Sequence, residues 1–124
     1  MKIHIDDSKS IAQIQQEFLD AFKYLKIEFF AKPHGEGESS PKKDLLDGNK
    51  KLSDIRTVHN EGDISITKAM TVNQVEQAFE DNFGIHVQLF RKQNESWLMT
   101  STTDEWTLAK QIETAEFMET PAED

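Results

Sequence analysis

An internal repeat constrains the fold of this chain more than any other feature of its sequence. Apolar residues near the start recur 61 positions later, so that Ile3, Ile5, Ile11, Ile14, Phe18 and Phe22 match Ile64, Ile66, Val72, Val75, Phe79 and Phe83. After a one-residue deletion beside Gly84, the residues Leu25, Ile27, Phe29, Phe30 and Lys32 match Ile85, Val87, Leu89, Phe90 and Lys92. Self-similarity of this kind indicates that one supersecondary unit occurs twice.

Each copy has the pattern of a strand, a helix and a second strand. The segments 3–5 and 64–66 alternate apolar and polar residues, which is typical of half-buried strands. Ser10 and Thr71 each precede an apolar helical stripe and are followed three residues later by a glutamine, which predicts two capping boxes. The segments 25–29 and 85–89 alternate again and predict the second strands.

Two tandem copies of this unit predict an α+β domain that is ferredoxin-like or a close variant. A doubly wound parallel sheet is the rival arrangement, although two copies supply few strands for it. We expect a single domain with copies at 2–32 and 63–92, a connection at 33–61, an added strand and helix at 96–118, and a frayed tail at 119–124. Within the connection, the Gly-, Ser- and Pro-rich stretch 34–41 predicts a mobile loop, and 50–59 predicts a short helix.

The composition narrows the possible partners. The formal net charge is −9, with −1 over residues 1–61 and −8 over residues 62–124, so nucleic acid is disfavoured as a ligand. The chain has no cysteine, which excludes disulfides and thiolate metal sites. The N-terminal segment lacks the apolar run of a secretory signal, and no segment is apolar enough to span a membrane. We therefore expect a cytoplasmic protein.

Catalytic motifs are absent from the sequence. It contains no phosphate-binding glycine loop, no nucleophile elbow and no H-E-x-x-H pair, so we expect neither catalytic residues nor a cofactor. In a ferredoxin-like sheet His4 and His86 would project from neighbouring strands, where they could bind a metal ion or titrate together. The alternative, which we favour, is that both are ordinary surface residues, and no metal site is predicted.

The matched pair Phe30 and Phe90 is the first candidate for a functional surface. Strand alternation places both on the sheet face opposite Ile27 and Phe29. Sheet-face aromatics of this kind stack on bases in RNA-binding domains, but the acidic charge argues against RNA here. We expect the C-terminal segment with Trp106, Leu108 and Ile112 to cover them, and a partner-binding patch is the alternative.

A cluster of polar and aromatic residues after the second copy is the other candidate. Arg91 lies near Trp97 and Thr103 in the sequence, and these residue types could bind a small ligand. His34 begins the predicted loop, and loops on rigid scaffolds often carry function. The alternative is an ordinary polar loop. The complete set of surface residues put forward is Phe30, His34, Phe90, Arg91, Trp97, Thr103 and Trp106.

The stretch FGIHVQLFRKQNESWLMTSTTDEWTL, together with LKIEFFAKPH, carries a family resemblance. It resembles an uncharacterised family of small bacterial proteins that have F-G-x-x-V-Q-x-F-R-K, a following Trp, and then T-T-x-D-x-W-T-L. The match runs from Ile11 to Gln111, and it implies a compact bacterial domain with no assigned activity. Met99 departs from the family pattern, where an acidic residue is expected, so a polar role at that position is not expected here.

The function that these observations favour is a small, non-enzymatic protein-interaction domain. It could associate with itself through a sheet edge or through the face with Phe30 and Phe90. The alternative is a small-molecule-binding protein or an enzyme that uses His34 or the residues from Arg91 to Thr103.

Overall fold

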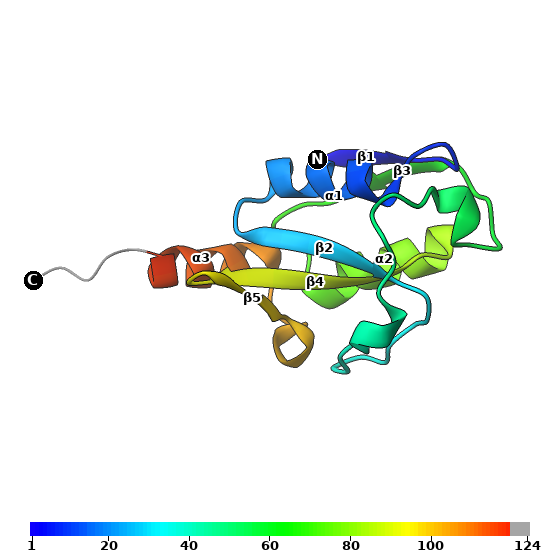
Figure 1. Cartoon of the computed structure of the whole chain (residues 1–124). Helices are drawn as coiled ribbons and strands as arrows, with labels where there is room; N and C mark the ends of the chain where they lie inside the picture. Colours follow the sequence, from blue (N-terminus) through cyan, green and yellow to red (C-terminus); the bar gives the residue numbers. More distant parts are fainter. Residues whose placement is uncertain (120–124) are drawn as a thin grey trace, which may run out of the picture.

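The computed structural model of the chain describes residues 1–119 (Figure 1). The order of elements is β1 (Lys2–Ile5), α1 (Ile11–Ala21), β2 (Leu25–Phe30), β3 (Gly62–Ser65), α2 (Val72–Phe83), β4 (His86–Gln93), β5 (Ser96–Met99) and α3 (Leu108–Glu119), with 3₁₀ turns at Lys42–Asp44, Leu52–Asp54 and Ser101–Thr103. The α+β class and the added C-terminal strand and helix are confirmed. The predicted tail lies outside the described residues, except for Glu119, which ends α3.

The strands form two separate antiparallel sheets, in which the β1–β3 and β2–β4 ladders join the two halves of the chain. β1 pairs with β3, and β2 pairs with β4, whose other side pairs with β5. In both ladders a strand of the first half lies beside the strand at the matched place in the second half, with Ile3 opposite Ile64 and Glu28 opposite Gln88. Figure 1 shows the β1–β3 ladder running above β2 and β4, with α1 alongside.

The ferredoxin-like arrangement is not confirmed, because it would place the four repeat strands in one sheet. The edge of β2 that could receive β3 is already occupied by the connection between the two halves. Leu46 N–H donates to the Phe29 carbonyl and Ala31 N–H donates to the Asp44 carbonyl, both at 2.8 Å. The connection thus adds itself to β2, and β3 pairs only with β1 among the described strands.

Both predicted capping boxes are present. Gln13 N–H donates to Ser10 Oγ at 3.2 Å while Ser10 N–H donates to Gln13 Oε1 at 2.8 Å. Thr71 and Gln74 make the same pair of bonds at 3.1 and 2.9 Å. Gly84 ends α2 with φ of +64°, in the left-handed region that glycine adopts without strain.

The short helix predicted over 50–59 is wrong in extent, since only Leu52–Asp54 forms a 3₁₀ turn. Leu52 N–H donates to the Lys9 carbonyl at 3.0 Å instead of to a carbonyl one turn earlier, so this segment is tied to the loop before α1. An equivalent bond joins Leu108 N–H to the Met70 carbonyl at 2.9 Å, in front of α2. In each half, the chain that follows the second strand therefore forms a hydrogen bond with the loop directly before the helix.

One hydrophobic core joins the two ladders and the three helices. Phe18 of α1 and Phe79 of α2 are fully buried, as are Ile3 and Ile66 from the β1–β3 side and Leu25, Phe29 and Leu89 from the other sheet. Leu108 and Ile112 of α3 complete this core. The two apolar helix stripes seen in the sequence are thus buried together. Over the part of the chain that the structure describes, no helix combines the length and apolar character needed to cross a bilayer.

Candidate functional site

The stretch predicted as a mobile loop, residues 34–41, is anchored at three points. Gly37 N–H donates to Asp104 Oδ2 at 2.8 Å, and the hydroxyls of Ser39 and Ser101 lie 2.7 Å apart. His34 Nε2 lies 3.1 Å from the carbonyl oxygen of Val87 in β4. The loop is therefore seated against β4 and against the segment that precedes α3.

His34 and Glu76 together cover an open edge of β4. β5 pairs with β4 only from Phe90 onward, so the earlier backbone groups on that side lack a strand partner. Glu76, from α2, accepts from Leu89 N–H at 2.9 Å with Oε2, while His34 bonds to the Val87 carbonyl. The Gln88 amide also donates to Glu76 Oε2, at 3.2 Å. Two side chains thus take the place of a missing strand.

The hydrogen bonds of His34 favour its protonated form. Its Nδ1 lies 2.9 Å from the Gly35 carbonyl oxygen, and its Nε2 faces the Val87 carbonyl oxygen. Carbonyl oxygens only accept hydrogen bonds, so these two contacts favour the doubly protonated ring, in which both nitrogens donate. Burial acts to lower the pKa of His34, but the bonds to these carbonyls and the charge of Glu76 outweigh burial, and the pKa is raised.

Glu76 is a buried carboxyl group beside the His34 ring. Burial raises the pKa of Glu76 to about 7, against the opposing effects of the Leu89 N–H bond and of His34. Glu76 Oε1 lies 3.6 Å from His34 Nε2 and makes no hydrogen bond to the described residues. Both pKa values are thus higher in the folded protein than in the unfolded chain. As the pH rises, the folded pair therefore loses its protons later than the unfolded chain does.

The cleft at this pair is small. It is lined by Pro33, His34, Glu36, Asn73, Glu76, Gln77, Glu80, His86 and Val87, and its volume of about 20 Å³ admits a water molecule and not an organic ligand. The sequence analysis singled out His34 but missed Glu76. The signal was present, since Glu76 follows the apolar residues Val72 and Val75 within the buried stripe of α2.

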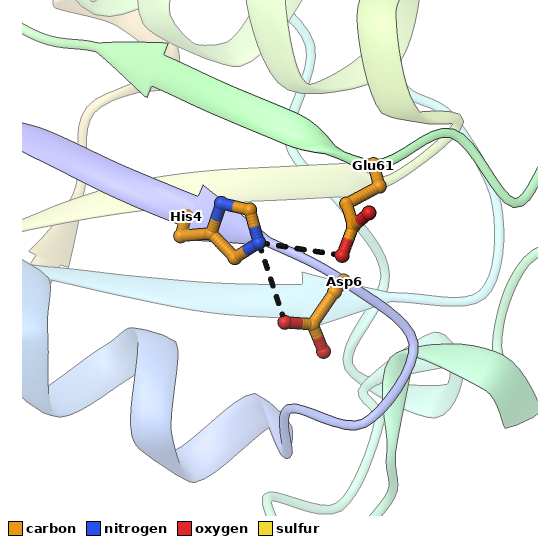
Figure 2. Close-up of side chains that lie close together, drawn as sticks. All are labelled: His4, Asp6 and Glu61. Atoms are coloured by element: carbon orange, nitrogen blue, oxygen red, sulfur yellow. Dashed lines mark ion pairs between the residues drawn. The ribbon is translucent and has the colours of Figure 1, made fainter.

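A second cluster surrounds His4 on the β1–β3 ladder. Figure 2 shows the ring of His4 pointing toward the carboxylates of Asp6, which follows β1, and Glu61, which precedes β3. His4 Nε2 lies 3.5 Å from Asp6 Oδ2 and 3.5 Å from Glu61 Oε1. On the other side of the ring, His4 Nδ1 lies 2.9 Å from Asp63 Oδ1. The hydrogen bond with Asp63 is the main cause that raises the pKa of His4.

The predicted meeting of His4 with His86 is wrong, because the two residues belong to different ladders. His86 instead lies beside α2, with its Nδ1 3.3 Å from Glu80 Oε1. The residues missed around His4 are Glu61 and Asp63. They flank Gly62, and Asp63 is the register partner of His4. Their proximity to His4 could be predicted only by knowing that β1 pairs with β3.

Phe30 and Phe90 lie on the outer face of the β2–β4–β5 sheet, as predicted. The expectation that the C-terminal segment covers them is wrong, because Leu108 and Ile112 join the core on the opposite face. Phe30 is 3% exposed and contacts the connection, with Leu45 as its bridge partner. An apolar groove of about 240 Å³ remains on this face, lined by Lys26, Glu28, Phe30, Lys42, Leu45, Phe90 and Met99.

The polar cluster proposed after the second copy is divided between the two faces of this sheet. Arg91 donates to Gln111 Oε1 at 2.7 Å, and the Gln111 amide donates to the Thr103 carbonyl and hydroxyl oxygens at 3.0 and 2.8 Å. The Trp106 ring lies 5.6 Å from the Arg91 guanidinium. Trp97, by contrast, lies beside Lys26, whose Nζ is 5.1 Å from the Trp97 ring centre. The buried Arg91 network ties α3 to β4, and Trp97 belongs to the outer face.

Comparison with protein-family models, with curated proteins and with solved structures gives no match for this chain.

Proposed function

We propose that this protein is a non-enzymatic interaction domain that binds a second copy of itself through the outer face of the β2–β4–β5 sheet. We call this surface the lysine-rimmed face and define it by Lys26, Glu28, Phe30, Lys42, Leu45, Phe90, Trp97 and Met99. The observation that carries the proposal is the apolar groove on this face. Leu45 is 43% exposed and Trp97 is 36% exposed, so large apolar side chains border the groove.

The groove is lined by two lysines and one glutamate, Glu28, whose Oε1 lies 3.3 Å from Lys26 Nζ, so its lining residues carry a small positive net charge while the whole chain is acidic. Lys26 Nζ lies 5.1 Å from the ring centres of both Phe90 and Trp97, and Lys42 lines the other side of the groove. The whole chain carries −9, most of it in residues 62–124. A second copy therefore presents acidic surface to an apolar face of slightly positive charge, which favours this contact over association through two like faces.

The C-terminal helix supplies an apolar side chain that fits such a groove. Phe117 on α3 is 80% exposed, the largest exposure among the large hydrophobic residues of the described chain. Met118 follows it, and Glu113 lies one turn before it on the exposed side of the helix. We infer that Phe117 of one copy enters the lysine-rimmed face of the next copy. Such a contact is heterologous, so copies add head to tail.

The competing hypothesis of a small-molecule site receives less support from the geometry. The His34–Glu76 cleft has room for about one water molecule, and the Arg91 network is buried and internally bonded. The cleft is far smaller than the hundreds of cubic ångströms that ligand pockets usually have, and the polar groups of the Arg91 network are already bonded to one another.

We also infer that the two halves descend from one duplicated unit, as the sequence repeat predicts. Matched positions make matched contacts: the Gln15 amide donates to Glu28 at 3.0 Å, and the Gln88 amide donates to Glu76 at 3.2 Å, with the glutamine and glutamate exchanged between strand and helix. The register of both ladders, which pairs each strand with its counterpart, is also expected for two copies related by a two-fold axis. We also propose that the protein is bacterial and cytoplasmic. An acidic interaction domain without disulfides is consistent with such an origin.

The proposal is tested by light scattering coupled to size-exclusion chromatography over a range of concentrations. The wild-type protein should exceed its monomer mass of 14.3 kDa increasingly as concentration rises. Phe117→Ser removes the inserted side chain, and Leu45→Glu places a negative charge in the groove. Each variant alone should be monomeric, and an equimolar mixture should form a dimer, because one intact Phe117 then meets one intact groove.

Val58→Ser is the matched control, since Val58 is an exposed apolar residue of the connection that lies near Gly84 at the end of α2 and does not line the groove, and its loss should leave association unchanged. Higher salt should weaken the association of the wild type, because lysines contribute to it. A wild-type protein that stays monomeric at about millimolar concentration would refute the proposal. Variants that associate as well as the wild type would refute the assignment of the surface.

A further inference from the structure

We propose that His4, Asp6 and Glu61 form a binding site for a divalent transition-metal ion, with Zn²⁺ as the best fit and Asp63 as the residue that orients His4. The three ligand atoms, His4 Nε2, Asp6 Oδ2 and Glu61 Oε1, lie within 4.8 Å of one another (Figure 2). This inference is independent of the interaction surface, which lies on the other ladder.

The first argument is the orientation of the His4 ring. Histidine ligands of metals usually donate their second ring N–H to a carboxylate, which fixes the tautomer and leaves the other nitrogen free to bind. Here His4 Nδ1 lies 2.9 Å from Asp63 Oδ1, its neighbour across the ladder. The remaining nitrogen, Nε2, then carries the lone pair and faces the two other carboxylates.

The second argument is that Asp6 is also held in place. Its Oδ1 accepts from Ser8 N–H at 2.8 Å and from the Ser8 hydroxyl, and these bonds lower the pKa of Asp6. The other oxygen, Oδ2, is left facing His4 Nε2. Two of the three ligands thus have one polar atom fixed by a supporting residue and a second atom turned toward a common point. Such support is what keeps metal ligands in position.

The third argument is the spacing of the ligand atoms. Ligands bound to tetrahedral Zn²⁺ at about 2.0–2.2 Å lie roughly 3.3–3.6 Å from one another. The two distances from His4 Nε2 are both 3.5 Å, so an ion could bind between these atoms with small side-chain movements. One nitrogen and two carboxylate ligands favour Zn²⁺ and its neighbours over Ca²⁺ and Mg²⁺, which prefer sites made entirely of oxygen.

The competing account is a set of ion pairs in which a protonated His4 donates to the surrounding carboxylates. The raised pKa of His4 is expected on both accounts, because the same carboxylates attract a proton or a metal ion. The two accounts differ in what happens when Zn²⁺ is added. Bound Zn²⁺ must displace the proton from Nε2, so its affinity should be higher at pH 7.5 than at pH 6.

The test uses the full chain without an affinity tag and titrates it with ZnCl₂ by isothermal calorimetry. We expect a single site that weakens by more than tenfold in His4→Gln and in Glu61→Gln, and by about tenfold in Asp63→Asn, which leaves the ligands intact. The matched control is His59→Gln, because His59 is similarly exposed but, among residues 1–119, pairs with a single carboxylate, Asp7. That variant should bind Zn²⁺ as the wild type does.

Nitrogen chemical shifts of the histidine rings provide a readout that needs no variant. Zn²⁺ should shift the His4 Nε2 signal and leave the His34, His59 and His86 rings unchanged. The proposal would be overturned if the wild type and His4→Gln bound Zn²⁺ equally, or if another histidine ring responded instead. Absence of any Zn²⁺ binding at pH 7.5 would leave the ion-pair account as the correct one.

Discussion

Replacement of Glu76 by glutamine should flatten the dependence of stability on pH between about 5 and 8.5. In the folded protein burial raises the pKa of Glu76 from its ordinary 4.5 to about 7, and the pKa of His34 beside it is raised as well. A group whose pKa is raised on folding holds its proton more tightly in the folded state. Its contribution to stability is therefore complete below the unfolded pKa and is lost as pH rises through the folded pKa.

The size of the effect follows from this shift. The difference between 4.5 and about 7, at about 1.36 kcal/mol for each pKa unit, corresponds to roughly 3 kcal/mol of unfolding free energy. His34 changes stability in the same direction, since it too loses a proton that the folded state retains. In Glu76→Gln the amide oxygen can still accept from Leu89 N–H, so the open edge of β4 keeps its partner while the titrating group is removed.

Urea unfolding at a series of pH values, followed by tryptophan fluorescence, measures this dependence. The wild type should lose roughly 3 kcal/mol between pH 5 and 8.5, and the variant should lose clearly less. Glu17→Gln is the control, because it removes a half-exposed carboxylate on α1 and should leave the wild-type slope. Equal slopes in the wild type and in Glu76→Gln, or a wild type that becomes more stable as pH rises, would show that the buried pair does not hold the proton.

Two further predictions concern the parts of the fold that the sequence repeat describes. Phe18→Ala and Phe79→Ala should each lower the unfolding free energy by about 3–5 kcal/mol, because both rings are fully buried and each leaves a cavity in the shared core. A loss below about 1 kcal/mol in urea unfolding would contradict the burial of that helix stripe. Ser10→Ala and Thr71→Ala should each cost about 1 kcal/mol, since each removes one side-chain bond to the first turn of a helix. Thermal unfolding of the double variant should give close to the sum of the single effects, and strong non-additivity would argue against two independent caps.

Part of the candidate surfaces could be identified from the sequence, and part could not. Strand alternation correctly placed Phe30 and Phe90 on the outer face, because side chains along a strand alternate whatever the strand pairs with. Strand alternation does not show, however, whether another segment covers that face. Leu108 fits a helix that packs on either side of the sheet, and only the packing of α3 against Arg91 and Leu89 decides the side.

The sequence by itself determined the local elements of this protein. The apolar stripes that carry Phe18 and Phe79, the capping boxes at Ser10 and Thr71, and the left-handed end at Gly84 depend on helical periodicity and on bonds between residues at most five positions apart. These interactions are complete within one or two turns, so a short window of sequence contains all of their partners.

The tertiary structure alone decided which strands pair and which polar side chains meet. β2 pairs with β4 and not with β3, and the connection bonds to the C-terminal end of its other edge, whereas the strand pattern alone is compatible with either partner. His34 meets Glu76, and His4 meets Glu61, across long stretches of chain. Contacts of this kind depend on the arrangement of whole elements, since a buried carboxylate or an unpaired strand edge acquires its partner only when the core has brought distant segments together.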